Sequence, residues 1–172
     1  MIKKNFLFKI LIIDFLFVTK SHAINIATIK IDYIINNVDN IILVRSTIVP
    51  GTTRALQEEF SNLRLVFNPE FLTERSAAFD FINQTRVILG GEKKYTDRVK
   101  YLYKHRFGDF LPVVETNFET AEMIKYMNNL FFATKVSFLN EMRLLSDKVG
   151  VDWNKAIDGF VLDGRVGHSH IA

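Results

Sequence analysis

Residues 41–53 read IILVRSTIVPGTT: an unbroken apolar run, an arginine, two hydroxyl side chains, two more apolar residues, a Pro-Gly pair and two threonines. A short apolar run without alternation is typical of a strand that is buried on both faces of a parallel sheet. The Pro-Gly pair marks a turn, and Thr52 or Thr53 is suited to cap a helix that runs to about residue 60. This stretch therefore predicts a strand, a turn and a helix of an α/β fold.

Outward from this stretch, extended and helical patterns alternate along the chain. The expected strands are residues 41–44, 63–67, 86–89 and 111–114, and the expected helices are residues 25–39, 52–60, 75–80 and 95–106. Alternating strands and helices favour an α/β sheet with parallel pairing.

The pattern changes at about residue 118. Apolar or small residues then recur at intervals of three and four, which predicts a single helix that ends near Gly150. These residues are Met123, Met127, Leu130, Phe131, Thr134, Phe138, Met142 and Leu145. Because one small sheet cannot cover all the apolar faces of so long a helix, we expect residues 118–148 to form a homodimer contact. A short helix over residues 153–160 follows, and a boundary between two structural units is expected near residues 115–118.

The composition excludes several classes of function. Hydrophobic residues make up 48% of the chain, which is enough to build a core. The formal net charge is only +3, and the 22 basic residues form no block of five, so we expect no nucleic-acid partner. The absence of cysteine excludes disulfides, cysteine-ligated zinc and a thiol nucleophile. It is compatible with a reducing cytoplasm, and no spacing of His, Asp or Glu predicts a metal site.

Residues 1–23 have two interpretations. A basic start, an apolar run over residues 6–18 and the small residues of Ser21-His22-Ala23 resemble a secretory signal, which would mean export. Lys9 and Asp14 interrupt the apolar run, and the run is too short for a transmembrane helix. The alternative is a divergent strand of a nucleotide-binding sheet, which agrees with a cytoplasmic protein.

Polar side chains with possible chemical roles follow the expected strands or lie on the long helix. Ser46 and Thr47 follow the end of the first strand, where ligands of open α/β sheets bind, although a hydroxyl there also caps helices. Glu70 and Glu74 are four residues apart; they suit either a solvated helix start or a proton-transferring carboxylate pair. Lys125 and Asn129, also four apart, and Arg165 are by spacing alone compatible with solvated side chains.

Three strings in this order resemble the UDP-glucose/GDP-mannose dehydrogenase family of nucleotide-sugar 6-dehydrogenases, and most of all its UDP-glucose members. They are residues 46–53 (STIVPGTT), residues 68–74 (NPEFLTE) and residues 121–129 (AEMIKYMNN). A fourth string, residues 162–167 (LDGRVG), is similar to the family's L-D-x-R-I-G. The resemblance covers roughly residues 25–170 and implies NAD as cofactor and a nucleotide sugar as substrate.

The resemblance also implies roles for particular residues. Thr47 would sit between nicotinamide and substrate and hold a water, Glu70 would manage protons, and Glu74 would lie by the cofactor. The backbone near Phe71 and Leu72 would contact the nucleotide sugar. The remaining implied site residues lie further along the chain: Lys125 and Asn129 would stabilise the developing oxyanion, and Arg165 would reach a partner subunit's sugar nucleotide. Arg75 departs from the glycine that the family has after the second glutamate.

Two parts of the family's pattern do not occur in this chain. It contains no G-x-G-x-x-G turn, and no cysteine that could form the family's thiohemiacetal. We therefore expect a fragment truncated at both ends: a partial Rossmann-like parallel sheet, followed by a long helix of an all-α central dimerisation domain. The predicted division is 1–23, 24–117 (the last part of an NAD-binding domain) and 118–172 (the first part of the central domain). Such a chain is expected to be inactive alone; the alternatives are a non-catalytic dimerisation module and the product of a split or degraded gene.

Overall fold

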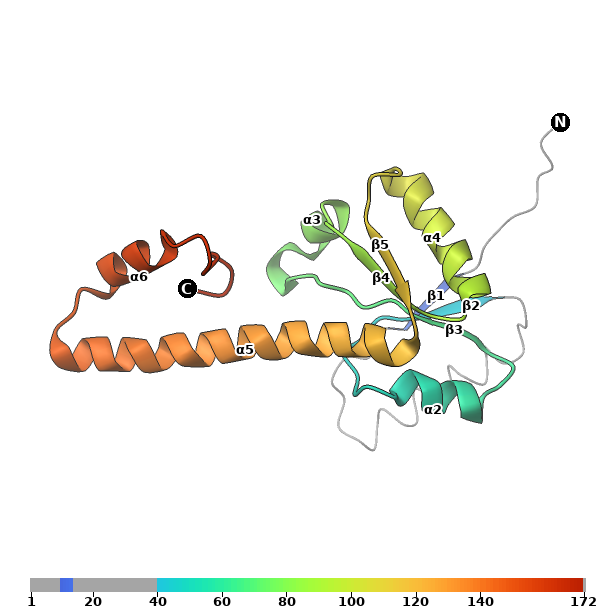
Figure 1. Ribbon diagram of the computed structural model, residues 1–172, viewed down its shortest axis with the longest axis horizontal. Helices are drawn as coiled ribbons and strands as arrows, with labels where there is room; N and C mark the ends of the chain where they lie inside the picture. Colours follow the sequence, from blue (N-terminus) through green and yellow to red (C-terminus); the bar gives the residue numbers. More distant parts are fainter. Residues whose placement is uncertain (1–9, 14–39, 172) are drawn as a thin grey trace. The chain divides into compact units, whose positions relative to one another are not determined.

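A computed structural model describes residues 10–13 and 40–171 of the chain (Figure 1). The strands are β1 (Ile10–Ile13), β2 (Ile41–Val44), β3 (Arg64–Phe67), β4 (Val87–Gly91) and β5 (Val113–Thr116). The helices are α2 (Thr52–Glu59), the 3-10 turn η1 (Glu74–Ser76), α3 (Ala77–Ile82), α4 (Lys93–Phe107), α5 (Phe118–Val149) and α6 (Trp153–Val161). The expected strands and helices from residue 41 onward are confirmed to within a few residues, and the helix expected over residues 25–39 lies outside the described residues.

The five strands form one sheet in the order β1-β2-β3-β4-β5. Strand β2 pairs in parallel with β1 and with β3, and β4 pairs in parallel with β5. The predicted fold class is therefore confirmed. One pairing departs from the parallel order: β4 runs antiparallel to β3, with Phe67 opposite Gly90. An antiparallel strand begins at the edge where its neighbour ends, so the segment between β3 and β4 need not cross back over the sheet.

The sheet is buried on both faces. On the face of α5, the alternate residues Ile42 and Val44 pack with Phe67 and with Phe118 of α5. On the opposite face, Ile41 and Leu43 pack with residues of α4 such as Val99 and Tyr103. Helix α2 lies on the other side of the sheet from α4 (Figure 1). Burial on both faces explains why β2 is an unbroken apolar run.

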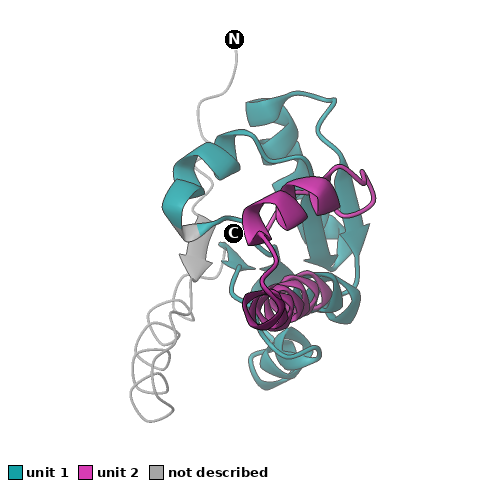
Figure 2. Cartoon of the chain, turned by 90° about the vertical axis from the view of Figure 1, so that its left-hand side faces the viewer, with its two compact units in different colours: residues 1–126 teal, residues 127–172 magenta. Residues whose placement is uncertain are grey.

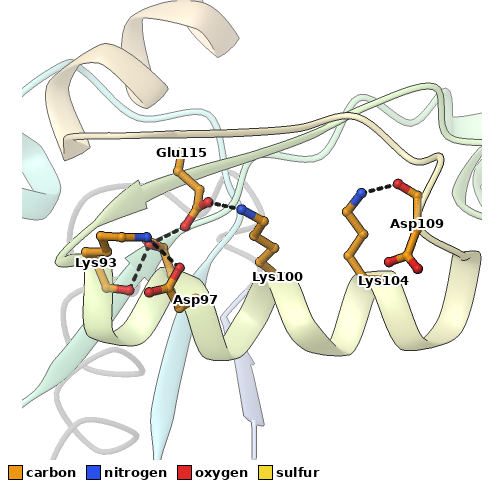
Figure 3. Close-up of polar contacts among 7 residues, drawn as sticks. Lys93, Asp97, Lys100, Lys104, Asp109 and Glu115 are labelled. Atoms are coloured by element: carbon orange, nitrogen blue, oxygen red, sulfur yellow. Dashed lines mark hydrogen bonds and ion pairs between the residues drawn. The ribbon is translucent and has the colours of Figure 1, made fainter.

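Polar contacts fix α4 against β5. The carboxylate of Glu115, on β5, accepts hydrogen bonds from Thr96 and Lys100 of α4 (Figure 3). On α4 itself, Lys93 pairs with Asp97 at 2.7 Å. Helix α4 is therefore held in a defined position against β5.

The chain divides into two compact units, residues 1–126 and 127–172, and α5 contributes to both (Figure 2). In the second unit, Lys135 donates hydrogen bonds to the carbonyl oxygens of Val166, Gly167 and Ser169, at 2.7–3.0 Å. The ring of His170 stacks on Phe132 with 4.1 Å between centroids. These contacts hold the turn at residues 163–171 against α5.

Part of the signal-like segment belongs to the sheet. Strand β1 lies within residues 1–23 and pairs with β2 from Ile10 opposite Ile41 to Ile13 opposite Val44. This pairing supports the interpretation of the segment as a strand; the rest of residues 1–23 lies outside the described residues. No helix in the described part of the chain is long and apolar enough to cross a membrane.

Candidate functional site

The candidate site begins where two paired parallel strands end. Thr47 lies three residues beyond Val44, the last residue of β2, and Glu70 lies three residues beyond Phe67, the last residue of β3. Val44 and Phe67 are opposite each other in the sheet. Both predicted site residues therefore follow the same edge of the sheet, the edge at which ligands of α/β sheets bind.

Lys125 is the predicted residue that the structure places most clearly. Lys125 is only 8% exposed. It lies on α5, 55 positions beyond Glu70 in the sequence. The ammonium donates a hydrogen bond to the main-chain carbonyl oxygen of Glu70. Burial lowers the pKa of Lys125, the nearby charge of Glu70 opposes this effect, and the guanidinium of Arg45 adds to it. Lys125 and Glu70, distant in sequence, therefore meet.

The ring of Phe71 contacts two cations. The Lys125 ammonium lies 5.3 Å from the ring centroid, and the guanidinium carbon of Arg86 lies 4.4 Å from it. Both distances are within the range of cation–π attraction. Phe71 and its neighbour Leu72 are half-buried, so the main chain that the resemblance assigns to substrate contact is held by packing.

Arg45 is a member of this site that sequence reasoning missed. It immediately follows β2, it is 8% exposed, and its Nη2 lies 4.0 Å from a carboxylate oxygen of Glu70. Its carbonyl oxygen also accepts a 3.4 Å hydrogen bond from the main-chain N–H of Glu70. The sequence did carry a signal for Arg45, which is a charged residue directly after a buried apolar strand. Charged residues are seldom buried unless they make a specific contact.

Asn68, which opens the NPEFLTE string, has a scaffolding role. Its amide nitrogen donates to the Ile88 carbonyl oxygen at 3.0 Å, and its amide oxygen accepts from the Tyr103 hydroxyl at 2.6 Å. Asn68 is 2% exposed, and burial raises the pKa of Tyr103. The Asn68 side chain thus joins the end of β3 to β4 and to α4, two residues before Glu70. These contacts hold the start of the loop that carries Glu70.

The predicted cap of α2 is wrong. Neither Thr52 nor Thr53 caps the helix with its side chain. The buried carboxylate of Glu122 accepts hydrogen bonds from the main-chain N–H of Gly51 at 2.6 Å and of Thr53 at 2.8 Å. A carboxylate satisfies the unpaired amides and the positive end of the helix dipole better than a hydroxyl does. A cap supplied from α5, about seventy residues away, leaves no local signal in the sequence.

The other predicted site residues are not brought into this cluster by any described contact. Glu70 lies in an irregular segment and Glu74 opens η1, so the two do not share a helix face, and the side chain of Glu74 lies outside the described residues. Asn129 and Arg165 belong to the second unit. Arg165 is highly exposed and pairs with Asp163 at 2.9 Å, and this pairing lowers the pKa of Asp163.

Two further properties limit the chemistry of the described residues. No group of three His, Asp or Glu side chains within residues 10–13 and 40–171 is placed to hold a metal ion. The amides at the N-terminus of α2, which a phosphate could otherwise use, are occupied by the carboxylate of Glu122. The described residues therefore offer no pyrophosphate cradle at α2.

Comparisons with known proteins agree with this architecture. Residues 20–107 match the family model described as the UDP-glucose/GDP-mannose dehydrogenase family, NAD binding domain, and residues 119–172 match the model of that family's central domain. The chain is 37% identical over 138 residues to UDP-glucose 6-dehydrogenase TuaD of Bacillus subtilis, covering 76% of this chain and 30% of that protein. It is 35% identical over 136 residues to UDP-glucose 6-dehydrogenase of Rickettsia bellii, covering 76% and 31%. A solved UDP-glucose dehydrogenase of Pyrobaculum islandicum superposes with a TM-score of 0.66 at 34% identity, covering 77% and 32%.

These matches define first a class, the oxidoreductases that have an NAD-binding α/β domain. Within that class, the chain belongs to the UDP-glucose/GDP-mannose dehydrogenase family. It spans about a third of the length of the relatives it matches. NAD is the cofactor of the family, and the substrates of its members are nucleotide sugars.

Proposed function

We propose that this chain carries one portion of a UDP-glucose 6-dehydrogenase site, which in a complete assembly converts UDP-glucose to UDP-glucuronate. The observation that carries the proposal is the meeting of Lys125 with Glu70, two residues that the resemblance assigns to the same reaction. UDP-glucose is favoured over other nucleotide sugars because relatives that are 37% and 35% identical to this chain are named UDP-glucose 6-dehydrogenases.

In this proposal, Glu70 handles protons and Thr47 orients a water. Glu70 lies beside Arg45, and its side chain is 37% exposed, so its carboxylate is held near a cation and still open to substrate. Thr47 is exposed at the adjacent strand end, where its hydroxyl can meet both water and substrate. These positions suit general acid–base chemistry at the sheet edge.

Lys125 and Asn129 would stabilise the oxyanion that develops during the reaction. The ammonium of Lys125 is already oriented by the Glu70 carbonyl and by the ring of Phe71, so little reorganisation is needed when negative charge appears. Asn129 lies on α5 four residues further along, and its amide would supply a second donor.

The remaining proposed roles concern binding. The main chain at Phe71 and Leu72 would contact the sugar nucleotide, and Arg165 would contact it from a partner subunit. Thr47 would lie at the nicotinamide of NAD, which supplies the hydride acceptor when bound, and Glu74 would lie beside the cofactor. Because Glu122 occupies the amides at the start of α2, we propose that the pyrophosphate of NAD is bound by a G-x-G-x-x-G turn, which this chain does not contain.

The chain alone is expected to be inactive, since the family's nucleophile is a cysteine and this chain has none. NAD reduction by the purified 172-residue chain with UDP-glucose or GDP-mannose tests this directly. Sugar-dependent formation of reduced cofactor above a protein-free control would contradict it.

Two alternative functions remain. The chain could serve as a non-catalytic interaction module, or be the product of a split or degraded gene. An adjacent reading frame that encodes the family's cysteine segment would favour a split enzyme. Failure of such a segment, with the glycine-rich turn, to restore activity to a folded mixture would favour a relic.

We also propose that the chain forms a homodimer through residues 118–148. Phe131, Phe138 and Leu145 lie seven residues apart on α5 and are 64%, 50% and 52% exposed, which forms an apolar stripe along one side of the helix. Sedimentation equilibrium should show a dimer that Phe138→Glu weakens. Asp147 lies nine residues after Phe138 and therefore on the opposite face of the helix, so Asp147→Lys should leave the dimer intact. A folded monomer at every concentration would contradict the proposal.

The domain division and the cellular location are also proposed here. We place the domain division at residues 117 and 118, where α5 begins, although the compact units divide at residues 126 and 127. We propose a cytoplasmic location, supported by the absence of cysteine and by the pairing of β1 within the sheet, because a cleaved signal would remove that strand. Export with cleavage after residue 23, detected by N-terminal sequencing, would contradict both the location and the role of β1.

A further inference from the structure

A cavity of about 230 Å³ lies between the sheet and the helices α3 and α4, within the first unit. Most of its wall is apolar and comes from Leu43, Phe81, Val99, Leu102 and Phe107. The rings of Phe81 and Phe107 meet edge to face with 5.6 Å between centroids. None of the residues implied by the family resemblance lines this cavity.

One buried cation interrupts the apolar wall. Arg45 lines the cavity, and its guanidinium carbon lies 5.8 Å from the centroid of Phe81. Its Nε–H is sealed from solvent and has no hydrogen-bond partner among the described residues. The carboxylate oxygen of Glu70 is 4.0 Å from Nη2, which is longer than a charged hydrogen bond. The planar donor fork of Arg45 is therefore incompletely used, which is unusual for a buried group.

A second cation lines the same cavity and is exposed. The guanidinium carbon of Arg106, near the end of α4, lies 5.1 Å from the centroid of Phe107, another wall residue. An exposed arginine at an apolar cavity attracts anions from solution, and a buried arginine whose Nε–H has no partner retains a donor for a carboxylate.

We propose that this cavity binds a small carboxylate with a flat apolar body. The ligand should be negatively charged because two arginines line the cavity, and its body should be apolar because most of the wall is apolar. A flat shape suits the two phenylalanine rings, and a cavity of about 230 Å³ is below the range of about 300–1,000 Å³ that accommodates drug-sized ligands. Because Nε is sealed, the guanidinium must reorient slightly so that Nε and one Nη face the carboxylate together.

Occupation of the cavity affects the candidate site, since Arg45 is shared. A bound carboxylate competes with Glu70 for the same guanidinium and draws it toward the cavity. The ligand therefore weakens the contact between Arg45 and Glu70 and leaves the Glu70 carboxylate with less positive charge beside it.

An NMR titration of the full chain with benzoate tests the proposal without any substitution. Benzoate should shift the Arg45 side-chain Nε–H signal and the methyl signals of Val99 and Leu102. Benzyl alcohol, which has the ring without the charge, should bind about tenfold more weakly. Inorganic phosphate should leave the methyl signals unchanged. Failure of benzoate to move the Arg45 Nε–H signal would overturn the proposal, as would equal binding of benzyl alcohol.

Variants separate this cavity from general surface attraction. Arg45→Met should reduce benzoate affinity about tenfold or more, and Arg98→Met, on α4 but not lining the cavity, should leave it unchanged. If Arg45→Met does not fold, Arg45→Lys, which retains the charge but not the planar fork, should still weaken benzoate binding. Equal affinity of wild type and either folded Arg45 variant would overturn the assignment.

Discussion

The buried carboxylate of Glu122 accepts a hydrogen bond from the main-chain N–H of Gly51, 71 residues earlier in the chain, at 2.6 Å. The same carboxylate accepts the N–H of Thr53 at 2.8 Å. The first turns of α5 thus hold the start of α2, the helix that follows Thr47 in the chain. Three residues further on, the same helix carries Lys125 to the carbonyl oxygen of Glu70. The start of α5 therefore links the two strand ends at which the candidate site is built.

Replacement of Glu122 should destabilise the first unit more than replacement of a partly exposed glutamate on the same helix. We expect Glu122→Gln to lower the free energy of unfolding by about 2–3 kcal/mol, because an amide accepts only one of the two hydrogen bonds and presents its own donors to the other. Glu119→Gln, which loses a partly exposed pair with Arg54, should cost about 0–1 kcal/mol. Urea denaturation measures both, and equal losses would contradict the capping role.

Lys125 should make stability depend on pH in the alkaline range. Burial lowers its pKa from the ordinary value of 10.5, so the folded chain releases this proton while the unfolded chain still holds it. The unfolded state then binds more protons, and stability rises with pH up to about 10.5. The difference in unfolding free energy between wild type and Lys125→Met should therefore move in favour of wild type as pH increases.

Lys93 should affect the pH dependence of stability in the opposite direction to Lys125. Its ion pair with Asp97 raises its pKa, so the stabilisation that it supplies is present at neutral pH and is lost above about 10.5. For Lys125, parallel stabilities of wild type and Lys125→Met over the alkaline range would contradict a lowered pKa of this lysine.

Tyr103→Phe should cost about 1–2 kcal/mol of unfolding free energy, because it leaves the amide oxygen of buried Asn68 without its donor. Tyr101, two residues earlier on α4, is 66% exposed, so Tyr101→Phe should change stability by less than about 0.5 kcal/mol. Thermal unfolding of the two variants compares them directly. Similar midpoints would mean that Asn68 does not depend on Tyr103.

Gly90→Ala should displace the start of α5 from the sheet. A Cβ at Gly90 would lie 2.6 Å from the Cβ of Ala121 and 2.8 Å from the carbonyl oxygen of Asn117. Such overpacking costs about 1–3 kcal/mol. Gly159→Ala, where a Cβ meets no atom within 4 Å, should be neutral or stabilise α6 by up to about 1 kcal/mol. Calorimetry of both variants tests the close approach, and a neutral Gly90→Ala would contradict it.

The sequence predicted the elements whose signals are local. The run Ile41–Val44 identified a strand buried on both faces, and the three- and four-residue spacing after Phe118 identified α5. The antiparallel pairing of β4, the capping by Glu122 and the burial of Arg45 were not predictable in the same way. Each depends on which distant segment packs against it, and neither propensity nor spacing encodes that choice. The meeting of Lys125 and Glu70 was anticipated only through the family's strings.

The most direct test of the account replaces the matching segment of Bacillus subtilis TuaD with residues 40–171 of this chain and measures NAD reduction with UDP-glucose. By the family's pattern, the remainder of that relative should supply the glycine-rich turn and the cysteine segment that this chain does not contain. If the segment retains the site, the chimera should oxidise UDP-glucose, and Lys125→Ala should lower the rate by about 10²-fold or more, as removal of an oxyanion donor does. A folded chimera that reduces NAD equally well with Lys125→Ala would contradict the account, as would a folded chimera that is inactive although it binds both ligands.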